Sequence, residues 1–184
     1  MIQKNNCFLV EGYTDVISFH QKEIENVVSS SGTSLTTGQI KLIKRFTNNI
    51  TVLYDGDAAG IKASFRGIDL ILKEGMNVKV ISFPDGEDPD SFAQKNTTTE
   101  LEEFVEKNAQ DFINFKTSIL LKDAGNDPIK KAGLIKEVMN SIALIPDMII
   151  RSVYTKEASN LLEIEEQTLI NELNKTRRDQ IAKE

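Results

Sequence analysis

One stretch decides the fold of this chain: Ile50-Thr51-Val52-Leu53-Tyr54-Asp55-Gly56-Asp57-Ala58-Ala59-Gly60. It opens with an apolar, β-branched run, which is typical of a strand buried on both faces of a parallel sheet. Side chains at i and i+2 point the same way along a strand, so Asp55 and Asp57 would both lie at the carboxyl edge of the sheet. Two close carboxylates favour a hard divalent cation between them. The alternative remains open that Asp57 caps the next helix and Asp55 is a solvated turn residue.

Strand-like and helix-like patterns alternate on both sides of this stretch. Short apolar runs predict further strands at Cys7–Val10, Val27–Val28 and Val78–Ile81. The helix after residue 57 carries an apolar stripe at steps of four, three and four residues, namely Ile61, Phe65, Ile68 and Leu72. This alternation predicts an α/β fold with a mostly parallel sheet flanked by helices.

The character of the sequence changes at about Thr97. No convincing strand follows, and apolar residues recur at helical spacing up to the last residues. Asp127-Pro128 and Pro146-Asp147 are typical of helix starts. We therefore predict two domains: the α/β domain at 1–96 and an all-α helical bundle subdomain at 97–184.

Composition narrows the classes of function. Cys7 and His20 are the only cysteine and histidine, which excludes an intrachain disulfide and a cysteine-based zinc site and argues against a histidine-dependent triad. No apolar run approaches the ~20 residues of a membrane helix, and no secretory leader is present, so we expect a cytoplasmic protein. The net charge is −6. Contact with nucleic acid would therefore need a local basic patch, bridging cations or another part of a longer protein.

Acidic residues follow three of the predicted strands. These residues are Glu11, the pair Asp55 and Asp57, and the pair Asp88 and Asp90. Several carboxylates without histidine suit Mg²⁺ or Mn²⁺ and disfavour zinc. Such ions bound to a phosphate serve phosphoryl or nucleotidyl transfer.

These motifs resemble the Toprim domain that primases, topoisomerases and related nucleases share. The finer resemblance is to bacterial DNA primase of the DnaG type, over about residues 7–95. Four segments carry it: the first motif at Val10–Val16, the Gly-Thr loop at Ser31–Thr36, the Asp-x-Asp motif at Leu53–Gly60 and a primase signature at Pro84–Asp90. Less specifically, the following helices, with Ile145-Pro146-Asp147 and Tyr154, are similar to the helical subdomain after Toprim in these primases.

The resemblance implies synthesis of short RNA primers on a single-stranded DNA template. The primer 3′-hydroxyl would attack the α-phosphate of a ribonucleoside triphosphate, and pyrophosphate would leave. Glu11, Asp55 and Asp57 would be catalytic, and together with Asp88 and Asp90 they would hold one to three Mg²⁺ or Mn²⁺ ions. The implied partners are the template, the triphosphates, the RNA primer and, through a module missing here, the replicative helicase. The implied location is the nucleoid-associated replication fork in the bacterial cytoplasm.

The chain departs from the family in two ways. Many relatives carry a basic residue where this chain has Ala58, and Lys62 and Arg66 on the next turns either supply that charge or are solvated surface residues. Relatives also have a zinc-binding module and a basic subdomain ahead of Toprim. We therefore expect a fragment that folds and binds metal but makes little primer alone.

Three alternative functions are weighed beside this one. A haloacid-dehalogenase-like phosphatase would use Asp55 as nucleophile and Asp57 as acid, but Thr or Val is expected where this chain has Ala59, and Glu11-Gly12 would have no role. Another Toprim enzyme, a nuclease or topoisomerase, is the second. The third is a docking module that binds a replication protein through the apolar stripe from Leu161 to Leu173, although packing of that stripe within its own bundle is favoured.

Overall fold

The central strand of the sheet is the apolar run that precedes Asp55. The computed structural model describes residues 1–31, 35–54, 58–84 and 86–182. Its parallel strands are β1 (Cys7–Val10), β2 (Val27–Ser29), β3 (Asn49–Tyr54) and β4 (Asn77–Ser82), in the order β2-β1-β3-β4. Val52 of β3 pairs with Leu9 of β1 on one side and with Val80 of β4 on the other. The strand is thus enclosed by neighbours, as its continuous apolar pattern predicts.

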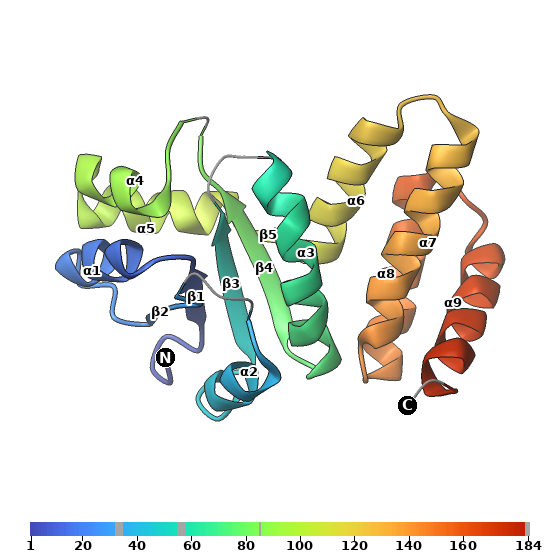
Figure 1. The fold of residues 1–184 in the computed structure, drawn as a ribbon, viewed down its shortest axis with the longest axis horizontal. Helices are drawn as coiled ribbons and strands as arrows, with labels where there is room; N and C mark the ends of the chain where they lie inside the picture. Colours follow the sequence, from blue (N-terminus) through green and yellow to red (C-terminus); the bar gives the residue numbers. More distant parts are fainter. Residues whose placement is uncertain (32–34, 55–57, 85, 183–184) are drawn as a thin grey trace. The chain divides into compact units, whose positions relative to one another are not determined.

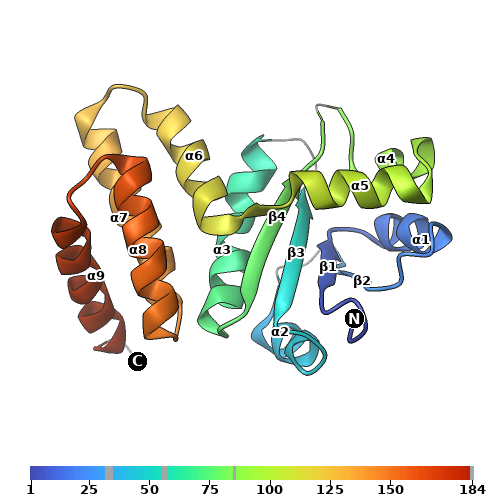
Figure 2. The same cartoon turned by 180° about the vertical axis from the view of Figure 1, so that it is seen from behind.

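Helices cover both faces of this sheet (Figures 1 and 2). The helices α1 (Tyr13–Gln21), α4 (Pro89–Lys95) and α5 (Thr98–Asn108) lie on one face, and α2 (Thr37–Lys44) packs beside α3 (Ala58–Lys73) on the other. The first face buries Leu53 and Ile81 of the sheet against Phe19 of α1. The prediction of a mostly parallel sheet flanked by helices is confirmed.

Local capping chemistry sets the ends of two helices on the second face. At the start of α2, the Thr36 hydroxyl accepts a hydrogen bond from the Gln39 backbone N–H at 3.3 Å, and the Gln39 side chain accepts one from the Thr36 N–H at 2.9 Å. Helix α3 ends at Lys73, and Gly75 follows with a φ of 73°, a left-handed conformation that glycine adopts without strain. Both signals are carried by residues within or next to the helix they bound.

A fifth strand and helix α5 extend this unit beyond the predicted boundary. Strand β5 (Gln110–Asp111) pairs antiparallel with β4. On α5, the Phe104 ring lies 5.3 Å from that of Phe83 and 4.4 Å from that of Phe92, measured between centroids. The first compact unit therefore runs from Met1 to Asp111, whereas the sequence analysis placed the boundary between residues 96 and 97 and expected no further strand.

The second unit, Phe112–Glu184, is a bundle of helices. Its described helices are α6 (Phe112–Ala124), α7 (Pro128–Leu144), α8 (Met148–Leu162) and α9 (Glu166–Ile181). Asp127 and Asp147 cap α7 and α8 by accepting hydrogen bonds from backbone N–H groups of the first turn. The prediction that an all-α helical bundle follows the α/β domain is thus confirmed. Within the described ranges, no helix combines the length and the apolar character that a membrane span requires.

Candidate metal centre

Glu11 lies at the carboxyl end of β1, where a tight turn leads into α1. The next residue, Gly12, is the N-cap of the helix, and its N–H donates to Oδ2 of Asp15 at 2.9 Å. A Cβ on Gly12 would lie 3.3 Å from that same oxygen, so a side chain at this position would crowd the turn. The backbone beside Glu11 is thereby fixed, while the Glu11 side chain itself is exposed.

Asp15 is a buried carboxylate to which the sequence analysis gave no role. Its side chain is 7% exposed and stands in the first turn of α1, where the partial positive charge of the helix N-terminus favours an anion. Asp15 could have been identified from the sequence by its position three residues after the N-cap Gly12, because an acidic residue there accepts a hydrogen bond from the N-cap N–H. Asp15 therefore shapes the turn that presents Glu11.

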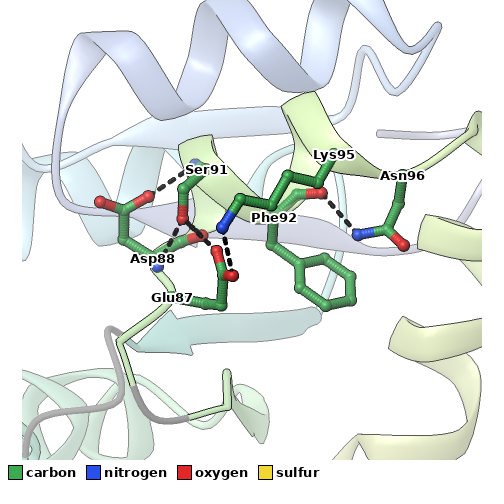
Figure 3. A network of polar contacts seen from close by, with 6 residues as sticks. All are labelled: Glu87, Asp88, Ser91, Phe92, Lys95 and Asn96. Atoms are coloured by element: carbon green, nitrogen blue, oxygen red, sulfur yellow. Dashed lines mark hydrogen bonds and ion pairs between the residues drawn. The ribbon is translucent and has the colours of Figure 1, made fainter.

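Asp88 caps helix α4 in the loop that follows β4. Its Oδ1 accepts a hydrogen bond from the Ser91 N–H at 2.6 Å, and its own N–H donates to the Ser91 hydroxyl at 3.0 Å. The Ser91 hydroxyl in turn donates to Glu87, which also pairs with Lys95 (Figure 3). The hydrogen bond from Lys95 lowers the pKa of Glu87 below its ordinary value. The network holds the start of α4 in one conformation and leaves the Asp88 side chain exposed.

Asp90 follows in the first turn of α4 and is partly buried. Its Oδ1 accepts hydrogen bonds from the Ser18 hydroxyl of α1 and from the Gln94 side chain of α4. The Oδ2 atoms of Asp88 and Asp90 accept no hydrogen bond from any described residue. Each carboxylate thus has one oxygen held by the protein and one that a cation could bind.

Three of the five predicted ligands are described. Glu11 follows β1, and Asp88 and Asp90 lie in the segment after β4, so these carboxylates lie beyond the carboxyl ends of parallel strands, as predicted. Asp55 and Asp57 fall outside the described residues. In the described ranges alone, no group of three or more His, Cys, Asp or Glu side chains could hold a metal ion. The proposed centre therefore depends on Asp55 and Asp57 joining the others, which remains a prediction.

The chemistry of the donors fits a hard cation. All five candidate ligands are carboxylates, and Mg²⁺ and Mn²⁺ prefer oxygen donors. The softer ligands stand elsewhere: Cys7 is fully buried in β1, and His20 is exposed near the end of α1. The residues present therefore suit Mg²⁺ or Mn²⁺ better than zinc.

A hollow of about 770 Å³ lies at the opposite edge of the same sheet. Amide side chains at the amino ends of the strands line it: Asn6 and Asn26 precede β1 and β2, and Asn49 and Asn77 are the first residues of β3 and β4. None of the predicted ligands contributes to it. The hollow and the candidate metal centre are therefore separate features of the first unit.

Comparisons with known proteins find similar families over both units. The Toprim-like family profile matches residues 8–93, and the profile of the DnaB-helicase binding domain of primase matches residues 113–167. A DNA primase of Clostridium acetobutylicum is 38% identical over 175 residues, which cover 90% of this chain and 28% of the relative. The chain spans less than a third of the length of the curated relatives it matches first.

Solved primase structures share the fold. The crystal structure of a DNA primase domain from Pseudomonas aeruginosa aligns with a TM-score of 0.80 at 27% identity, covering 94% of this chain and 56% of that one. The structure of a DnaG primase catalytic domain bound to single-stranded DNA aligns with a TM-score of 0.74 at 31% identity, covering 85% and 51%. The match of the helicase-binding profile to 113–167 corrects one expectation, that a helicase-binding module is missing here. With these similarities over both units, the chain belongs to the DnaG-type bacterial DNA primase family.

Proposed function

We propose that this chain is the metal-binding part of a DNA primase, which joins ribonucleoside triphosphates into a short RNA primer on single-stranded DNA at the replication fork in the bacterial cytoplasm. The observation that carries the proposal is the placement of Glu11, Asp88 and Asp90 beyond the carboxyl ends of parallel strands in a Toprim-like fold. The likeness to a primase catalytic domain bound to single-stranded DNA supports the template as a partner.

In this proposal the ions are held by Glu11, Asp55, Asp57, Asp88 and Asp90. A bound divalent ion would neutralise charge on the reacting phosphate and lower the pKa of the attacking hydroxyl. The primer 3′-hydroxyl attacks the α-phosphate, and pyrophosphate leaves. The residues of this chain fix where the carboxylates stand: Asp15 closes the turn beside Glu11, and the α4 cap sets Asp88.

The 184 residues alone are expected to make little primer. Binding of the template and the triphosphates needs Lys and Arg side chains near the phosphates, whereas this chain carries a net charge of −6. The relatives are more than three times as long, so the remainder of such a protein is the proposed source of these contacts. Primer synthesis by the 184 residues at the rate of an intact primase would contradict this expectation.

A Mn²⁺ titration by calorimetry tests the metal centre. We compare the parent chain with a folded Asp55→Asn/Asp57→Asn variant. Binding by the parent that the variant loses is the expected result, because the two central carboxylates would be ligands. Equal binding by both chains would refute the assignment of Asp55 and Asp57, since carboxylates elsewhere would then hold the ion.

We also propose that the second unit contacts a replicative helicase of the DnaB type. The helicase-binding profile covers α8, and this helix exposes Met148, Ile149 and Val153, at 73%, 71% and 59%. Ile149 and Val153 are four residues apart and therefore lie on one face of the helix. By contrast, Leu162, Leu169 and Leu173 of the stripe considered from the sequence are buried in the bundle. The α8 face is thus the better candidate for docking.

A binding assay with a DnaB-type helicase tests this partner. Because exposed apolar side chains at an interface contribute through their burial, we expect Ile149→Ser/Val153→Ser to weaken binding by at least about tenfold. The control is Ile129→Ser on α7, where the residue is more exposed still, at 83%. Unchanged binding by the double variant, or an equal loss in the control, would exclude the α8 face as the contact.

A further inference from the structure

Ser18 joins the helix that follows Glu11 to the acidic loop after β4. It lies on α1, is only 5% exposed, and donates its hydroxyl hydrogen to Oδ1 of Asp90, 72 residues further along the chain. A buried hydroxyl requires a hydrogen-bond partner, so this contact ties α1 to α4 at one defined point. The helix that begins beside Glu11 thereby also determines where Asp90 stands.

Gln94 donates to the same oxygen of Asp90. Its Nε2 lies 2.7 Å from Oδ1, one helical turn further along α4. Hydrogen bonds to an ionised carboxylate are stronger than neutral ones, and two donors on one oxygen fix the orientation of the group. Oδ2 accepts no hydrogen bond from a described residue, so it is the oxygen left for another ligand. Asp88 differs, because its cap bond comes from the backbone of its own helix.

We propose that Ser18 and Gln94 are positioning residues that orient Asp90 so that its Oδ2 binds a divalent ion. This inference rests on the proposed function, in which Asp90 is a metal ligand. Neither residue touches the ion or the reacting atoms; both act through Asp90. Side chains that hydrogen-bond to metal-binding carboxylates in this way typically change metal affinity by 10- to 100-fold when they are removed.

Calorimetric titration of the 184-residue chain with Mn²⁺ tests the inference. Ser18→Ala should weaken the affinity by about tenfold, and Gln94→Ala should weaken it in the same direction. In an Asp90→Asn background neither substitution should have any further effect, because the group through which they act is already altered. The matched control is Ser118→Ala on α6, whose hydroxyl bonds only within its own helix, to the Phe115 carbonyl at 2.8 Å, and which should leave the affinity unchanged.

The possible outcomes separate this inference from the proposed function. If the parent binds Mn²⁺ and Asp55→Asn/Asp57→Asn does not, but Ser18→Ala and Gln94→Ala bind like the parent, the positioning role is wrong and the metal centre stands. A lower thermal midpoint with unchanged affinity leads to the same conclusion. Effects that add to that of Asp90→Asn also overturn the inference. A parent chain that binds no Mn²⁺ overturns both. If Ser18→Ala does not fold, the Mn²⁺ affinity of Gln94→Ala tests the inference, because Gln94 is exposed and its substitution does not disturb the core.

Discussion

The thiol of Cys7 lies fully buried in β1, and this burial raises its pKa from 9.0 to about 12. The folded chain therefore keeps a proton that the unfolded chain loses above pH 9, so stability falls as the pH rises from 9 toward 12, by ~1.4 kcal/mol per pH unit. Between pH 8 and pH 10 we expect the parent to lose about 1.4 kcal/mol of unfolding free energy relative to Cys7→Ala. Urea unfolding of both proteins at the two pH values measures this difference, and parallel losses would contradict it.

Single residues also show how far the candidate site can be predicted from sequence. The positions of Glu11, Asp88 and Asp90 beyond strand ends follow from the apolar runs before them, because parallel strands end at one edge. The hydrogen-bond partners of these side chains cannot be predicted from the apolar runs. Ser18 contacts Asp90, which lies 72 residues further along the chain, and the sequence of α1 does not indicate that contact. Such contacts depend on how two helices pack, which residue spacing within either helix does not encode.

At the scale of elements, α5 is attached to the sheet by a cluster of three phenylalanine rings. Phe104 is partly buried against Phe83 and Phe92, so its removal would leave a cavity at this junction. We expect Phe104→Ala to lower the free energy of unfolding by about 3 kcal/mol. The matched control is Phe46→Ala after α2, which should change it by less than about 1 kcal/mol because that ring is 46% exposed. Chemical denaturation measures both, and equal effects would show that the ring cluster does not hold α5.

The elements differ in how well local sequence predicts them. The start of α2 and the end of α3 depend on local sequence, because Thr36, Gln39 and Gly75 satisfy backbone groups of their own helix. Strand β5 was missed because its two residues, Gln110 and Asp111, are polar and carry no apolar run. It exists through pairing with β4, a strand about thirty residues earlier. The compact unit ends at Asp111 rather than at the boundary expected at residue 96 because α5 and β5 contact the sheet through residues distant in sequence.

For the whole molecule, the division at Asp111 predicts which truncations will fold. A chain of residues 1–111 keeps α5 over the sheet and β5 beside β4, whereas a chain of residues 1–96 loses both and uncovers Phe83 and Phe92. We expect the longer chain to unfold cooperatively in urea. The shorter chain should lack a cooperative transition or aggregate, because the exposed rings and the open edge of β4 are sites for association.

Circular dichroism and gel filtration of the chains 1–96 and 1–111 decide whether the first unit ends at residue 96 or at residue 111. Residues 112–184 serve as the complementary chain. If the compact units fold separately, 1–111 and 112–184 will each be monomeric and ordered, and Mn²⁺ binding will remain with 1–111, which contains every proposed ligand. If 1–96 is as stable as 1–111, then α5 and β5 contribute nothing to the sheet, and the boundary expected from the sequence is the better one. Should 112–184 bind a DnaB-type helicase while 1–111 binds Mn²⁺, the proposed metal centre and the proposed docking face would belong to separate folding units.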